Sequence, residues 1–263
     1  MPSPPAELAQ PAAELLTWHL IVDPDGRPGA VNMACDQALL DATAAGGPPT
    51  LRLYRWFPAA LSLGRNEPAA RRYDRAKIAA LSLDVVRRPS GGRAVWHQEE
   101  LTYAVAAPIA AFGTLSASYA AIHRRLVTAL RALGAPATLA PQGPLGPLRA
   151  APCFDLSAGG EVLVGDRKLV GSAQVRRGGA FLQHGSILLA GTQDLVRDLA
   201  GKPAGSGSET TLASVLGRRV SFGEVACAVS GAFGCDLTEA GTTVPPPPGL
   251  TAAFRDPAWT WRR

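Results

Sequence analysis

Two residues of this chain, Cys153 and Lys168, carry the side chains needed for acyl transfer through a thioester. Cys153 lies at the edge of a stretch rich in proline and glycine, and Lys168 follows fifteen positions later. The thiolate is the reactive form of cysteine, and a nearby cation lowers the pKa of the thiol from about 8.5 toward neutrality. Lysine can also stabilise a developing oxyanion or help to move a proton. We therefore predict that Cys153 is a nucleophile and that Lys168 assists it.

The scarcity of lysine supports a chemical role for Lys168. Of the 26 basic residues only Lys77, Lys168 and Lys202 are lysine, so arginine is used almost everywhere else. Arginine keeps its proton, whereas the surroundings of a lysine can move its pKa. We expect Lys77 and Lys202 to be ordinary surface charges, and Lys168, directly after an arginine, to be functional.

Length and composition indicate one large globular domain. The 263 residues include 47% hydrophobic residues, which suffices for a buried core. No apolar run reaches about 18 residues, so no membrane span is expected, and the N-terminus does not resemble a secretory signal. Widely spaced cysteines without a CxxC pair argue against a structural zinc site and fit a reducing compartment. We expect a cytoplasmic protein without a metal. The cysteines are Cys35, Cys153, Cys227 and Cys235.

The net charge of +5 and the pI near 9.3 favour an acidic partner. The arginines are scattered as pairs and no nucleic-acid-binding motif accompanies them, so nucleic acid is not the expected partner. An acidic carrier protein fits the same charge.

The elements expected to position these residues alternate between strands and helices without a βαβ rhythm, which indicates an α+β fold. Helices are predicted at 30–43, 74–81, 116–133, 211–216 and 222–233, and strands at 18–22, 51–56, 60–63, 84–88, 94–96, 101–107, 161–164, 168–175 and 180–189. We expect 60–63 to form a hairpin with 51–56, and compact structure to end at the prolines of 245–248. The predicted division is a leader (1–15), a catalytic domain (16–236) and a proline-rich tail (237–263).

A glycine pair at Gly91-Gly92 offers a second candidate site. Paired glycines let backbone N–H groups approach a phosphate or carbonyl oxygen, but they also form ordinary turns, and the pair alone favours the turn. Arg88 before the pair and His97 after it add charge and a titratable ring to the loop.

Two longer blocks resemble signatures of the lipoate–protein ligase/biotin ligase superfamily. The first is 87–97 (RRPSGGRAVWH) with 100–103 (ELTY), and the second is 167–174 (RKLVGSAQ) with 182–189 (LQHGSILL). Shorter similarities are 32–39 (NMACDQAL) and 62–65 (SLGR). The resemblance covers residues 18–233 in order, and such paired blocks are more specific than a single short motif. It implies an α+β fold of mixed, largely antiparallel sheets flanked by helices.

Within that superfamily the chain resembles the octanoyltransferases of the LipM type. Cys153-Phe154, followed by a Lys-x-x-Gly-Ser-Ala strand from Lys168, matches their pattern. ATP-dependent lipoate ligases usually have a third glycine where this chain has Arg93. The resemblance therefore assigns the nucleophile to Cys153 and the residue that lowers its pKa to Lys168. Residues 158–160 depart from the pattern, because a bulkier segment that shapes the acyl pocket is expected there.

The resemblance implies transfer of octanoyl from octanoyl-acyl-carrier protein to a lysine of a lipoyl domain or glycine-cleavage H protein. No nucleotide and no other cofactor is needed, because thioester exchange is nearly thermoneutral and amide formation is downhill. Residues from both blocks are expected to bind substrate. These are Arg88, Gly91, Gly92, Arg93, Ala94 and His97 from the first block and Gly171, Ser172, Ala173, His184 and Gly185 from the second.

Three alternatives stay open at this point. An ATP-dependent lipoate–protein ligase would form an acyl-adenylate on the glycine loop and would leave Cys153 without a role. An amidotransferase that moves octanoyl between carrier proteins would differ only in its preferred donor. A carrier-binding protein without activity would have a cysteine of ordinary reactivity.

Overall fold

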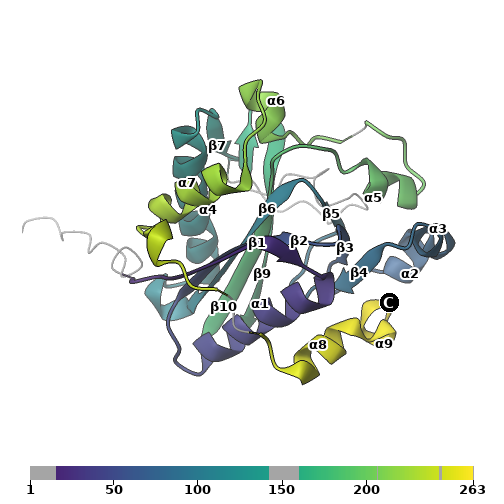
Figure 1. Ribbon diagram of the computed structural model, residues 1–263, viewed down its shortest axis with the longest axis horizontal. Coiled ribbons are helices and arrows are strands. Elements are labelled where there is room, and N and C mark those ends of the chain that lie inside the picture. The colour runs from purple at the N-terminus through teal and green to yellow at the C-terminus, as the bar shows by residue number, and fades with distance from the viewer. Residues whose placement is uncertain (1–15, 142–159, 206, 243–244, 263) are drawn as a thin grey trace, which may run out of the picture.

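The computed structural model describes residues 16–141, 160–205, 207–242 and 245–262. Within that part, the larger sheet is formed by β1 (His19–Arg27), β2 (Thr50–Trp56), β6 (Glu100–Pro108), β7 (Ala137–Leu139), β8 (Val162–Val164), β9 (Arg167–Arg177) and β10 (Ala180–Leu188). Their order is β1-β2-β6-β10-β9-β8-β7, and all neighbours are antiparallel except β1 and β2 (Figure 1). Mixed, largely antiparallel sheets with flanking helices confirm the predicted α+β class.

A smaller sheet contains β3 (Ala60–Leu63) between β4 (Asp84–Arg87) and β5 (Val95–His97). β3 is parallel to β4 and antiparallel to β5. The predicted hairpin of 51–56 with 60–63 is therefore wrong: the chain leaves one sheet after β2 and enters the other. Three short helices pack apolar side chains against this sheet. They are α2 (Ala69–Arg72), α3 (Arg75–Ala80) and α5 (Asp194–Leu199).

Helices cover both faces of the larger sheet. On one face, α4 (Leu115–Ala132) and α7 (Phe222–Ala232) enclose an apolar core with β6 and β10. Leu126 and Leu130 of α4 are fully buried there, and burial of one such side chain stabilises the fold by about 1.5–3 kcal/mol. On the other face, α1 (Gly29–Ala44) packs against β6, β9 and β10. A short helix, α6 (Leu212–Leu216), precedes α7.

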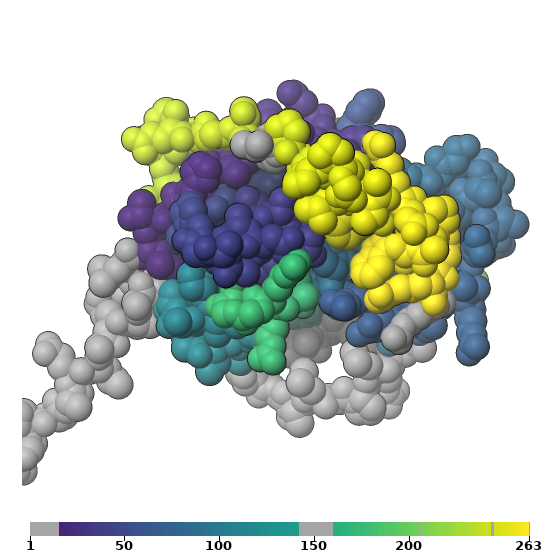
Figure 2. Space-filling view, turned by 90° about the horizontal axis from the view of Figure 1, so that it is seen from below, coloured from purple at the N-terminus to yellow at the C-terminus, as the bar shows by residue number. Residues whose placement is uncertain are grey.

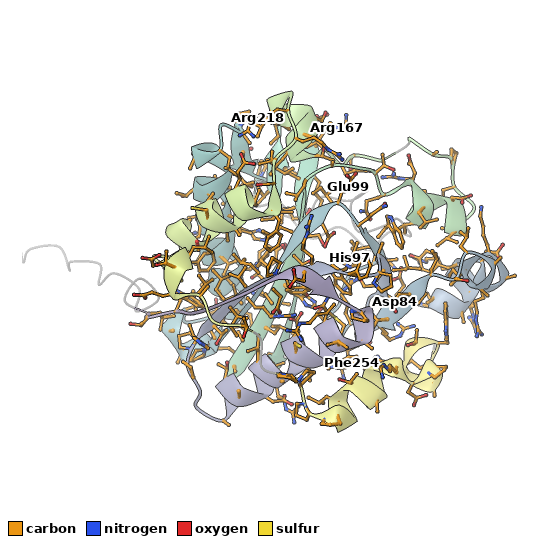
Figure 3. The ribbon with its side chains drawn as sticks, viewed as in Figure 1. Asp84, His97, Glu99, Arg167, Arg218 and Phe254 are labelled. Carbon is orange, nitrogen blue, oxygen red and sulfur yellow. The ribbon has the colours of Figure 1, made fainter. Side chains whose placement is uncertain are left out.

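Compact structure continues beyond the prolines, so that part of the sequence prediction is wrong. α8 (Pro248–Arg255) packs on α1 and buries Phe254 between them, and α9 (Pro257–Thr260) follows (Figure 3). Figure 2 shows this yellow segment seated against the purple-to-blue N-terminal half of the chain. The attachment is also polar, because Arg87 Nε donates to the Thr260 carbonyl at 2.8 Å and Trp259 Nε1 donates to the Arg87 carbonyl at 2.9 Å.

The helices and strands predicted from hydrophobic spacing are present, with shifted ends. The helix predicted at 30–43 is α1, and Asp74 caps α3 by accepting from Lys77 N at 3.0 Å, as expected. The first strand was predicted to end at 22 but continues to Arg27 across a register shift. In the described ranges, the helices are all too short or too polar for a membrane span.

Candidate active site

A small pocket, partly open to solvent, lies between α1, the larger sheet and β5. Both sequence blocks contribute to it, and the predicted substrate-binding residues that line it are Arg88, His97, Gly171, Ser172, Ala173, His184 and Gly185. The rest of the wall is largely apolar and aromatic, formed by Met33, Tyr54, Trp56, Val95, Thr102 and Ser186. A wall of this composition suits an apolar group beside a few polar ones.

Adjacent strands approach closely at the pocket because position 185 is glycine. A Cβ atom added to Gly185 would lie 2.5 Å from the Gly171 carbonyl oxygen and 2.8 Å from the Tyr103 ring. In the ladder, Gly185 pairs with Ser172, and Gly171 pairs with Ser186. The glycines of the second block therefore allow the close contact that shapes this wall.

Arg88 holds the glycine loop, and Gly91, Gly92, Arg93 and Ala94 lie outside the pocket lining. Arg88 Nη2 donates to the carbonyl oxygens of Gly91 at 3.1 Å and Arg93 at 2.7 Å. Gly92 has a φ of 88°, in the left-handed region that favours glycine. The Arg88 guanidinium therefore fixes the backbone of the loop. Val95, which follows the loop in sequence, lines the pocket.

His184 belongs to a buried charged network on α1 and β2. His184 Nδ1 lies 2.8 Å from Asp36 Oδ2, and His184 Nε2 lies 2.5 Å from Ser90 Oγ. Asp36 also accepts from Arg52 Nη1 and from the Tyr54 hydroxyl, both at 2.9 Å. Burial and the Asp36 charge raise the pKa of Tyr54, so Tyr54 stays a neutral donor.

His97 is buried in a second network on the smaller sheet (Figure 3). Its Nδ1 lies 2.7 Å from Glu100 Oε1, its Nε2 lies 2.5 Å from Ser62 Oγ, and Trp56 stacks on the ring at 4.0 Å. Burial lowers the pKa of His97, and the Arg88 charge acts in the same direction against the opposing Glu100. His97 is therefore held as a neutral ring in the wall of the pocket.

His123, on α4, joins a third network that the sequence did not indicate. Its Nδ1 lies 2.6 Å from the Gly160 carbonyl oxygen, so this nitrogen carries the proton. Its Nε2 accepts from the Ser172 hydroxyl at 2.9 Å, and Ser172 Oγ lies 2.7 Å from the Tyr103 hydroxyl. Burial lowers the pKa of His123 to about 4. This chain connects the pocket wall to Gly160.

We expect His123 to make stability depend on pH. Unfolded histidine takes up a proton below about 6.5, whereas folded His123 stays neutral down to about 4, so the free energy of unfolding is greatest above pH 6.5. It should fall by about 3 kcal/mol as the pH drops to 4. Urea denaturation across this range should show His123→Gln losing that part of the decline, while His19→Gln, at an exposed position, keeps it. Parallel curves for His123→Gln and the wild type would contradict the assignment.

Lys168 is buried and forms an ion pair. Its side chain is 1% exposed, and its Nζ lies 2.5 Å from Glu161 Oε1. The backbone of Lys168 bonds to Ser208 and Thr210, which fixes the start of β9. Lys168 is not among the residues that line the pocket. Cys153 and the loop around it lie outside the described residues, so the predicted pairing of Cys153 with Lys168 stays a prediction.

The sequence contained a signal for a buried polar pair that the prediction missed. Asn32 and Asp36 lie four positions apart on α1, a spacing that places both on one face of the helix, and both are buried. Buried polar groups need hydrogen-bond partners, so this pair could have indicated the buried network around Asp36 and Arg52. His123 and Glu161 had no such signal. The described residues contain no group of three His, Cys, Asp or Glu side chains that could hold a metal ion.

Known proteins resemble this chain over most of its length. The family model of the lipoyl protein ligase A/B catalytic domain matches residues 28–234. The octanoyltransferase LipM of Symbiobacterium thermophilum is 40% identical over 234 residues, which cover 82% of this chain and 85% of that protein. The octanoyltransferase LipM of Moorella thermoacetica is 38% identical over 226 residues, 80% of this chain and 82% of that protein.

Solved structures share the fold. A lipoate-protein ligase A bound with ATP matches with a TM-score of 0.75 at 20% identity, over 94% of this chain and 98% of that one. A bi-partite lipoate protein ligase from Thermoplasma acidophilum matches with a TM-score of 0.70 at 20% identity, over 94% and 96%. At this identity the likeness extends to the fold alone.

Proposed function

Because this chain belongs to the lipoyl protein ligase A/B catalytic-domain family, we propose that it is an octanoyltransferase of lipoate biosynthesis. The observation that carries the proposal is the 40% identity to an octanoyltransferase over more than four fifths of both chains. The largely apolar pocket beside both sequence blocks supports it, since each buried methylene of an acyl chain contributes about 0.8 kcal/mol.

The proposed reaction has two steps. The Cys153 thiolate attacks the thioester carbonyl of octanoyl-acyl-carrier protein, the bond from that carbon to the carrier's sulfur breaks, and the carrier leaves as a thiol after taking up a proton. The amine of a lysine then attacks the octanoyl-S-enzyme, forms an amide and releases Cys153. The acceptor is a lipoyl domain or glycine-cleavage H protein.

The side chains of the site have separate roles in this proposal. The Lys168 ammonium favours the thiolate of Cys153 and the oxyanion that forms in each step. Arg88 keeps the glycine loop in place, and the pocket between His97 and His184 receives the octanoyl chain. The net charge of +5 steers acidic carrier domains toward the protein.

Intact mass spectrometry tests the proposal. After the protein is mixed with octanoyl-acyl-carrier protein, its mass should increase by one octanoyl group, and hydroxylamine should remove that group. Addition of a lipoyl domain should return the protein to its original mass and octanoylate the domain. A protein whose mass stays unchanged, while the domain is octanoylated, would refute the thioester route.

Transfer is expected to proceed without ATP. Arg93 stands where a third glycine would let a nucleotide phosphate approach the backbone, and its carbonyl is held by Arg88. Calorimetric titration should therefore detect no ATP binding, and free octanoate with ATP should not replace octanoyl-acyl-carrier protein. Tight ATP binding, or modification of the domain from free octanoate, would favour a lipoate–protein ligase instead.

A further inference from the structure

Exposed arginines gather where the short helices on the smaller sheet meet the C-terminal helices. Arg65 follows β3, Arg71 belongs to α2 and Arg75 begins α3, and all three are exposed. Arg262 follows α9, is also exposed, and donates from Nη2 to the Arg65 carbonyl oxygen at 2.5 Å. These four residues form the arginine patch. The two parts of the chain lie side by side, because Trp261 packs into the apolar cluster of α2, α3 and the smaller sheet (Figure 2).

The arginine patch has few carboxylates to balance it. The segments that carry it, 64–77 and 256–262, contain six cations and three carboxylates, of which one is buried and two cap α3 and α9. The two cations outside the patch form ion pairs, whereas within the described ranges Arg65, Arg71 and Arg75 form none. Like charges held together repel one another and destabilise a fold, so the patch indicates a partner that supplies the missing carboxylates.

Two tryptophans hold members of the patch in place. The Arg262 guanidinium lies 4.1 Å from the centre of the Trp259 ring, and the Arg75 guanidinium lies 4.7 Å from the centre of the Trp261 ring. Such cation–π contacts order long side chains that solvent would otherwise leave free to move. Guanidinium groups bind carboxylates through two parallel hydrogen bonds, and ordering them in advance lowers the entropy cost of binding. The patch is therefore prepared to bind an acidic surface.

The patch begins at the loop beside the pocket. The backbone N–H of Arg65 donates to the Ser90 carbonyl oxygen at 2.8 Å. Arg88, which lines the pocket, donates from Nη1 to the Ser62 carbonyl oxygen at 2.9 Å, on the strand that precedes Arg65. The described lining residues of the pocket include none of the four arginines. A protein bound to the patch would therefore lie beside the pocket.

We propose that the arginine patch docks the acidic domain of the octanoyl-acyl-carrier protein, an inference that rests on the function proposed above. A carrier presents its thioester on a long, flexible prosthetic arm, so its domain can bind beside the pocket while the arm enters it. The acceptor lysine has only a four-carbon stem, so the acceptor domain has to bind at the pocket itself. The position of the patch therefore fits the donor of the octanoyl group, and its charge fits an acidic domain.

The test compares two charge-reversed variants of the full-length protein. Arg65→Glu/Arg71→Glu changes the patch, and Arg124→Glu/Arg176→Glu makes the same change in net charge at exposed positions on α4 and near the end of β9. With octanoyl-acyl-carrier protein at low salt, we expect the patch variant to have a KM raised about tenfold and an unchanged kcat. The control variant should match the wild type, and both variants should keep the wild-type KM for the lipoyl domain.

Two further measurements separate docking from damage to the pocket. Octanoyl-pantetheine keeps the thioester but lacks the carrier domain, so the patch variant should use it as well as the wild type does. The difference in KM for the carrier should also shrink as salt is raised to about 1 M, because the Debye length falls to about 3 Å. If the reversed variant does not fold, Arg65→Gln/Arg71→Gln still decides, because it removes the two charges without introducing new ones and should raise the same KM by a smaller factor.

Four results would overturn the docking. The patch variant could keep the wild-type KM for octanoyl-acyl-carrier protein, or the control variant could show the same increase, which would mean that only net charge matters. An equal loss with octanoyl-pantetheine would mean that the patch only supports the pocket. A raised KM for the lipoyl domain alone would place the acceptor on the patch. A wild type that transfers octanoyl from neither donor would instead refute the function proposed above.

Discussion

Replacing Cys153 with serine is expected to abolish octanoyl transfer, lowering the rate at least about a thousandfold. A serine hydroxyl at this position would not ionise near neutral pH, whereas a thiol beside a cation does. The measurement is octanoylation of a lipoyl domain by Cys153→Ser under conditions in which the wild type completes the reaction. Intact mass spectrometry of the same variant should show no hydroxylamine-labile octanoyl group.

Two other cysteines provide matched controls for Cys153. Cys35 is buried, and burial raises the pKa of its thiol, so little of it is thiolate at neutral pH. Cys227 is exposed on α7, and α7 covers the face of the larger sheet opposite to the face that α1 covers. Cys35→Ala and Cys227→Ala should therefore keep most of the activity. Peptide mapping that found octanoyl on another residue would refute the assignment of Cys153.

Replacing Lys168 is expected to cost both stability and activity. Lys168→Ala removes the ammonium that lies 2.5 Å from the buried Glu161 carboxylate. Loss of one member of a buried ion pair destabilises a protein by about 3–5 kcal/mol, so the denaturation midpoint should fall markedly. Iodoacetamide alkylation of Cys153 should also shift to higher pH, because the cation that favours the thiolate is lost.

A double variant separates these two effects. In Lys168→Met/Glu161→Gln no buried charge lacks a partner, so stability should return toward the wild type while transfer stays lost. Lys168→Arg should also lose most of the transfer, since the planar guanidinium does not fit a space occupied by an ammonium and cannot release a proton. Near-normal transfer by Lys168→Arg, or an unmoved alkylation profile in Lys168→Ala, would refute the pairing of Lys168 with Cys153.

The sequence predicted local structure well where the signal is local. Apolar spacing predicted α1 and α4 to within a residue at each end, and the Asp74 cap was recognisable from its residue type. Strand pairing was harder to predict, because the alternation of apolar and polar residues identifies a strand but not the strand beside it. The strand at 60–63 therefore received the wrong partner, and β7 and the C-terminal helices were not predicted.

The site was predictable as two blocks but not as a network. Both blocks do meet at one pocket, with His97 and His184 in its wall. The partners of these histidines come from distant positions: Asp36 lies 148 residues before His184, and Ser62 lies 35 before His97. A single sequence contains no signal for such pairs. The Lys168–Glu161 pair was missed for a related reason, since a lone glutamate beside glycines resembles a surface residue.

The attachment of the C-terminal helices has a consequence for biosynthesis. Arg87 binds the Thr260 carbonyl, 173 positions further along the chain, and its neighbour Arg88 holds the glycine loop. A nascent polypeptide that has emerged from the ribosome only as far as residue 240 lacks this attachment, so the loop cannot yet be fully supported. We therefore expect competence for catalysis to arise late in translation, once 248–260 have docked.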